Sequence, residues 1–132
     1  MFDAYVKELR GIVSSVEAAN DPAFGATALR LSEALDALDR AGRWLRSQLE
    51  TSPDAALAGA TPFLRMFGHA AGGALLAHEA ILAARLGEEA GASARIADAR
   101  FFAENIAVQT GGLATAVTEG AQTITGAEFS AS

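Results

Sequence analysis

Apolar residues recur every three or four positions along four segments of the chain, and this spacing constrains the fold more than any other feature. Residues spaced in this way share one face of an α-helix, where a neighbouring helix can bury them. In the first segment, for example, Val6, Leu9, Val13 and Val16 share such a face. The pattern predicts helices at about residues 2–19, 22–50, 53–87 and 93–125.

The links between these segments carry residues that begin or interrupt helices. Asp21-Pro22 and Ser52-Pro53 each place a capping side chain before a proline, which loses no hydrogen bond at the first position of a helix. Ser93 repeats the capping signal before the last segment. Pro62 lies inside the third segment, where it removes a backbone donor and predicts a kink.

Short links between four amphipathic helices predict one all-α domain over residues 1–132, an antiparallel up-down four-helix bundle. The helices differ in length, because at 1.5 Å per residue the third and fourth span roughly 50 Å and the first roughly 27 Å. The first helix is therefore too short to cover the groove between its long neighbours. We expect an apolar strip to remain for a second copy or a neighbouring domain.

The third segment is expected to bury its large apolar residues. Its predicted seam consists of Leu57, Ala60, Leu64, Phe67, Ala71, Ala74, His78 and Ile81, widened by Phe63, Met66, Leu75 and Leu82. On such a seam a lone histidine is most often a hydrogen-bonded structural residue, so His78 is expected to be one.

Composition and charge support the helical reading and exclude several functions. Hydrophobic residues make up 51% of the chain, and alanine, the commonest of them, loses no side-chain entropy in a helix. The net charge is −6, and the basic cluster of Arg40, Arg43 and Arg46 lies beside Asp36 and Asp39, with which Arg40 and Arg43 are expected to pair. We therefore expect no nucleic-acid partner.

The distribution of charged residues along the chain also bears on membrane insertion and on where the protein is located. The longest uncharged run is too short and too polar for a membrane span, and charged residues interrupt the first turns where a secretory signal would need an apolar stretch. The chain contains no cysteine. We expect no membrane insertion and a cytoplasmic location.

No arrangement of residues suited to catalysis or metal binding stands out. A di-metal site in a helical bundle needs Glu-x-x-His on two helices, but Met66 and Leu75 occupy the required positions before His69 and His78. No serine lies at helical spacing from a histidine, as a nucleophile and its base would require. We expect no catalytic, cofactor-binding or metal-binding residue in this chain.

Glycines inside the helices suggest a contact surface instead. Each costs about 0.5–1 kcal/mol relative to alanine, so a close backbone approach should compensate. Gly68, Gly72 and Gly112 are the candidates. The close approach could lie between the third and fourth helices or against another subunit or domain.

The start of the fourth segment offers the other candidate interface residues. Arg100 and Glu104 can pair four residues apart, either as a plain surface pair or as a polar contact across an interface. Phe101 and Phe102 are adjacent, so they point about 100° apart on a helix. One of them should enter the bundle, and the other should be partly exposed or covered by a partner.

Two segments of the second half resemble a known domain. Residues 60–84, which begin Ala-Thr-Pro-Phe-Leu-Arg-Met-Phe-Gly, and residues 94–105, Ala-Arg-Ile-Ala-Asp-Ala-Arg-Phe-Phe-Ala-Glu-Asn, carry the likeness. They are similar to the helical C-terminal extension of a branch of bacterial acyl-CoA dehydrogenases that includes the methylmercaptopropionyl-CoA dehydrogenases. The similarity is clearest over residues 57–120, whereas residues 1–50 share only helical, alanine-rich character.

The resemblance implies a parent enzyme that binds FAD and oxidises an acyl-CoA thioester to the enoyl form. In that family the flavin pocket and the catalytic glutamate lie in a preceding core, so the domain has a structural role: it packs on the core and helps to fix a dimer. The implied partners are the core domain and a second copy. The alternatives are a free-standing bundle that binds an apolar ligand or a partner protein, and a di-metal bundle.

Overall fold

A computed structural model describes the backbone of residues 1–131 and the side chains of residues 1–120. This part of the chain is helical and contains no strand, which confirms the predicted all-α class. The α-helices are α1 (Phe2–Ala19), α2 (Thr27–Thr51), α3 (Pro53–Leu86), α4 (Ala92–Asn105) and α5 (Thr110–Ala131), and the short 3₁₀ turns are η1 (Pro22–Phe24), η2 (Glu88–Ala90) and η3 (Ala107–Gln109).

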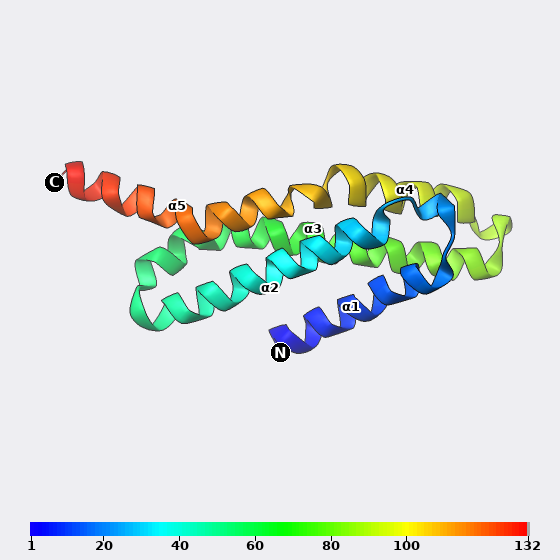
Figure 1. Ribbon diagram of the computed structural model, residues 1–132, viewed down its shortest axis with the longest axis horizontal. Helices are drawn as coiled ribbons and strands as arrows, with labels where there is room; N and C mark the ends of the chain where they lie inside the picture. The colour runs from blue at the N-terminus through cyan, green and yellow to red at the C-terminus, as the bar shows by residue number, and fades with distance from the viewer. Residues whose placement is uncertain (132) are drawn as a thin grey trace.

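The helices lie lengthwise beside one another, and the chain turns back at the links before α2, α3 and α4 (Figure 1). α4 and α5 together make the last run along the bundle, with η3 between them. α3 contacts each of α1, α2, α4 and α5. It is therefore the central helix, and the way it divides its residues between its faces shapes the whole surface.

The first link differs from its prediction in detail. The helix predicted to begin at residue 22 begins at Thr27. Pro22–Phe24 form a 3₁₀ turn, and Gly25, with a φ of 54°, interrupts the helical conformation between this turn and α2. Asp21 is a cap as predicted, since its carboxylate accepts a hydrogen bond from the backbone N–H of Ala23 at 2.9 Å. It caps η1 rather than α2.

The predicted helix 93–125 is divided in the structure. α4 ends at Asn105, and α5 begins at Thr110 and continues to Ala131, beyond the predicted end. The fully buried hydroxyl of Thr110 donates to the carbonyl of Ala107 at 2.6 Å, which satisfies a polar group inside the core. The break in the helix is thus stabilised locally.

Ser93 does not cap α4 as predicted. Gly91 takes the N-cap position, and the Ser93 hydroxyl instead donates to Oε1 of Glu88 at 2.6 Å. The hydroxyl therefore ties the start of α4 to η2.

α1 is held against its neighbours by aromatic and charged side chains. The rings of Tyr5 and Phe67 stack with their centroids 5.5 Å apart, which joins α1 to α3. Arg10 pairs with Asp36 of α2 at 2.8 Å, so Asp36 does not make the pair predicted with Arg40. The predicted pair of Asp39 with Arg43 is present.

α3 buries only part of the seam predicted for it: Met66, Ala71, Ala74 and Ile81 are buried as expected. The buried residues are mainly small: Ala56, Gly59, Met66, Ala70, Ala71, Gly73, Ala74, Ala77, Ala80, Ile81 and Ala83. The large residues placed on the predicted seam, Leu57, Leu64, Leu75 and Leu82, are 73%, 70%, 52% and 43% exposed, and His78 is exposed as well. The predicted seam is wrong for these residues. Small side chains on this buried face let the axes of the neighbouring helices come close.

The first turns of α3 lie at an angle to the rest of the helix (Figure 1), which is the kink predicted for Pro62. The N-terminal end of α1 lies near this point: Phe2 packs on Phe63 with ring centroids 5.9 Å apart and contacts Gly42. Leu49 and Leu57 lie beyond the end of α1 and are exposed. As the helix lengths predict, α1 leaves apolar surface uncovered.

Candidate functional site

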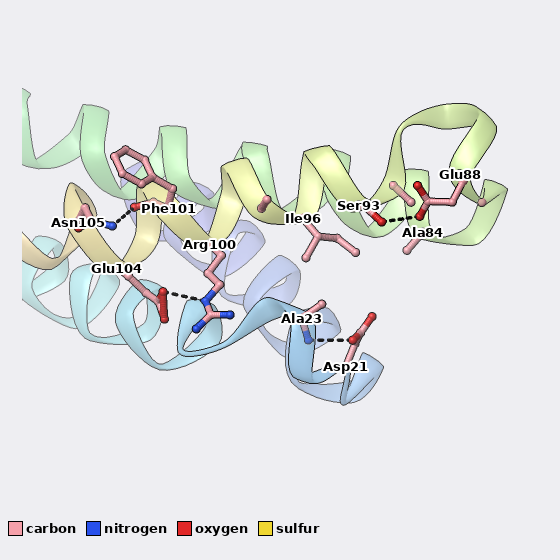
Figure 2. A pocket seen from close by; sticks show the side chains of 13 residues that line it. Asp21, Ala23, Ala84, Glu88, Ser93, Ile96, Arg100, Phe101, Glu104 and Asn105 are labelled. Atoms are coloured by element: carbon pink, nitrogen blue, oxygen red, sulfur yellow. Dashed lines mark hydrogen bonds and ion pairs between the residues drawn. The ribbon is translucent and has the colours of Figure 1, made fainter.

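α4 lines a groove of about 700 Å³ together with η1 and the end of α3 (Figure 2). Glu88 and Ser93 lie at one end of this α4 groove, and Arg100, Phe101 and Glu104 lie toward the other. The groove contains most of the charged and aromatic residues that the sequence analysis selected on this helix.

Arg100 and Glu104 form the predicted ion pair, with Nε of Arg100 2.9 Å from Oε2 of Glu104. The other carboxylate oxygen, Oε1, accepts the backbone N–H of Ala26 at 3.2 Å. Arg100 also lies over Gly25, where a Cβ atom would be 2.6 Å from Cζ of the arginine. The pair therefore holds α4 against the start of α2, and its predicted part in an interface stays a prediction.

These contacts stabilise the charged form of Glu104. The hydrogen bond from Arg100 lowers the pKa of Glu104 most, and the hydrogen bond from the backbone of Ala26 lowers it further. Because the folded pKa lies below the ordinary value, this contribution to stability is present above pH 4.5 and is lost as the pH falls through the folded pKa.

We expect Glu104→Gln to lower the thermal unfolding midpoint at neutral pH, because the amide keeps the shape of the side chain but loses its charge. The difference between the parent chain and the variant should shrink as the pH falls below 4.5. Thermal melts followed by circular dichroism across this range would measure it. A difference that stays constant on acidification would contradict the assigned role of the carboxylate.

The two phenylalanines divide between the core and the surface, as their adjacency predicts. Phe102 is the one that enters: its ring packs against Gly72 and Gly73 of α3, and a Cβ atom at Gly73 would be 3.3 Å from Cδ1 of Phe102. Phe101 points the other way, lines the α4 groove and is 61% exposed. Phe101 is therefore available to a partner, whereas Phe102 is not.

The candidate glycines also divide. Gly72 lies beside the ring of Phe102, but a Cβ atom there would be 3.5 Å from Cζ of Phe102, which is an ordinary contact, so the predicted close approach is not found at Gly72. Gly68 and Gly112 have open space where a Cβ atom would be, so no contact inside the described part of the chain explains them. Their predicted role in an interface stays open.

Gly68 and Gly73 provide a matched test of packing on α3. Gly68→Ala should raise the free energy of unfolding by about 0.5–1 kcal/mol, because alanine loses less backbone entropy and meets nothing. Gly73→Ala should lower it by about 1 kcal/mol, because its Cβ atom would lie 2.5 Å from Cδ2 of the fully buried Leu31. Urea unfolding measures both, and a gain for Gly73→Ala would contradict the tight packing.

The histidines do not form a reactive cluster. Nδ1 of His69 is buried without a hydrogen-bond partner among the described residues, and burial, followed by the charge of Arg65, lowers the pKa of His69. His78 is exposed on the outer side of α3. Within the described residues no group of three or more histidine, cysteine, aspartate or glutamate side chains gathers where a metal ion could bind.

Over the same stretch of the chain, none of the helices combines the length and the apolar character needed to cross a membrane.

The comparison with known families decides what kind of domain this is. Residues 5–128 match the family described as acetyl-CoA dehydrogenase C-terminal like. The chain belongs to this family. The match includes α1 and α2, for which the sequence resemblance rested on helical character alone. No curated protein and no solved structure gives a significant match.

Sequence reasoning missed two features of this family member's surface. The first is the contact of Glu104 with Ala26, which joins residues 78 positions apart and leaves no local signal. The second is the row of exposed leucines on α3, for which the repeated spacing of the alanines was an available signal.

Proposed function

We propose that this chain is a non-catalytic C-terminal domain of an FAD-dependent acyl-CoA dehydrogenase, from the bacterial branch that resembles the methylmercaptopropionyl-CoA dehydrogenases. The observation that carries the proposal is the family match over nearly the whole chain. In this proposal the parent enzyme oxidises an acyl-CoA to the enoyl-CoA in the cytoplasm. The role of this domain is contact, both with the enzyme core and with another subunit.

The chemistry of the α4 groove supports a role other than cofactor binding. FAD carries a negatively charged diphosphate, which binding sites usually neutralise with helix N-termini or free cations. The groove instead presents the carboxylates of Asp21, Glu88 and Glu104, and its cation, Arg100, is already paired with Glu104. These residues do not fit FAD, so we assign no step of the oxidation to this chain.

The distribution of apolar side chains supports contact as the role. Leu57, Leu64, Leu86 and Phe101 are each more than 60% exposed, although they belong to the residue types that proteins bury most readily. An antiparallel up-down bundle of unequal helices suits such a role, because a short α1 leaves parts of its longer neighbours free to meet a partner. Large apolar side chains that are exposed together on one surface often mark an interaction site.

Flavin binding and turnover by the purified chain test this proposal. After incubation with FAD and removal of free flavin, the chain should retain no flavin absorbance. It should also give no dye-linked oxidation of acyl-CoA substrates. Bound FAD or turnover would overturn the non-catalytic assignment.

The reading frame distinguishes the proposal from a free-standing bundle. The proposal expects the frame that encodes residues 1–132 to continue upstream into a dehydrogenase core. A start codon at Met1, with no such core upstream, would favour a separate bundle that binds an apolar ligand or a partner protein.

A further inference from the structure

The outer side of α3 carries five exposed leucines in one row. Leu57, Leu64, Leu75, Leu82 and Leu86 follow one another at intervals of seven, eleven, seven and four residues. At 100° per residue these intervals place all five within an arc of about 40°. We call this surface the leucine face. It lies opposite the alanine-rich face that packs into the bundle; Leu57 precedes the kink at Pro62, and the other four leucines follow it.

The leucine face is nearly symmetric about its middle. Leu57 and Leu86 are equally far from a point between Ala71 and Gly72, and so are Gly68 and Leu75. Arg65 and Glu79 lie beside the leucines on the same side of the row, and their midpoint is Gly72. Gly68 is exposed and has open space around it, so the row has a notch at the position symmetric to Leu75.

We propose that two copies of this chain associate through their leucine faces, with the two α3 helices antiparallel and a two-fold axis near Ala71 and Gly72. This inference rests on the proposed function as a contact domain and names its partner as a second copy. A two-fold axis requires one surface to complement itself, and the symmetry of the leucine face meets that requirement.

The antiparallel direction follows from the charges and the notch. In this register Leu75 of one copy inserts at Gly68 of the other, and the ends of the face pair leucine with leucine. Arg65 of one copy comes beside Glu79 of the other, on the same side of the interface. Arg65 makes no ion pair with another described residue, whereas Glu79 pairs with Arg95 of its own chain and keeps a second carboxylate oxygen. A parallel pair would place Arg65 of one copy and Glu79 of the other on opposite sides of the interface, without this contact.

Sedimentation equilibrium of the 132-residue chain tests the association. A face one helix wide predicts a dimer with a Kd of about 1–100 µM. The double variant L75Q/L82Q should weaken it by about 100-fold, because each leucine is buried twice in a two-fold dimer. The matched control L29Q/L49Q removes two exposed leucines of α2 and should leave the Kd unchanged.

Two results would overturn the proposal. One is a chain that stays monomeric across this concentration range, and the other is a dimer that L75Q/L82Q does not weaken. Circular dichroism of each variant confirms that it is folded, since both substituted leucines lie on the surface of the monomer. A monomer would leave the family assignment and the flavin result untouched, so failure here is distinguishable from failure of the proposed function.

Disulfide trapping tests whether the two α3 helices are antiparallel. The chain contains no native cysteine, so only the introduced cysteines can form a disulfide. In the antiparallel register G68C/L75C should form covalent dimers on mild oxidation, because the two positions meet across the axis within disulfide reach. Within one helix they lie about 10 Å apart and cannot join. L75C alone should form no covalent dimer and should run as a monomer on non-reducing denaturing electrophoresis. Efficient dimerisation of L75C alone would indicate a parallel pair and overturn the proposed geometry.

Discussion

Replacing Leu31 by alanine should lower the free energy of unfolding by about 2–5 kcal/mol. Leu31 lies on α2 with no exposed surface, and its Cδ2 atom lies against the backbone of α3 at Gly73. The variant removes buried apolar atoms and leaves a cavity, which the surrounding alanines are too short to fill. Urea unfolding followed by circular dichroism measures the loss.

Leu29→Ala is the matched control, because Leu29 lies two residues away on the same helix and is 54% exposed. Its effect should stay within about 1 kcal/mol, since most of its surface is in contact with water in the folded chain. Equal losses for the two variants would contradict the assignment of Leu31 to the core.

Larger side chains on the buried alanine face of α3 should also lower the free energy of unfolding. Ala74 and Ala77 have no exposed surface, so Ala74→Leu and Ala77→Leu each force extra methylenes into a filled space. Each should lower the free energy of unfolding by about 1–3 kcal/mol through overpacking. The same urea titration applies, with single variants so that each remains measurable.

The control for these two variants makes side chains smaller on the opposite, exposed face of α3. Leu75→Ala and Leu82→Ala, measured at concentrations where the chain is monomeric, should each change stability by less than about 1 kcal/mol. A larger loss at these leucines than at the enlarged alanines would mean that α3 is packed as the sequence pattern first predicted.

α3 shows where prediction from sequence reaches its limit. Two series of apolar residues follow helical spacing on this helix, the leucines from Leu57 to Leu86 and the alanines from Ala70 to Ala83. The seam predicted from the spacing takes residues from both series. The structure places the smaller ones inside, and which series meets the neighbouring helices is decided only in the assembled fold. α1 offered a single apolar series, and its prediction held.

The α4 groove shows the same division between local and long-range information. The spacing of Arg100 and Glu104 predicts their pair, because residues four apart are neighbours on any helix. It cannot predict that Glu104 also accepts the N–H of Ala26, which only the packing of η1 on α4 brings near. Likewise, the adjacency of Phe101 and Phe102 cannot tell which one enters the core; in the structure it is Phe102, which packs beside Gly72 and Gly73.

Thiol labelling of single-cysteine variants tests the central claim most directly, that α3 packs by its alanines and presents its leucines outward. A77C should be protected from a maleimide reagent at every protein concentration, because Ala77 has no exposed surface. L75C and L82C should react rapidly in dilute protein and more slowly as the concentration rises and the dimer forms. If L75C and L82C are as protected as A77C at the lowest concentration, the leucine face lies inside the monomer and the account is wrong.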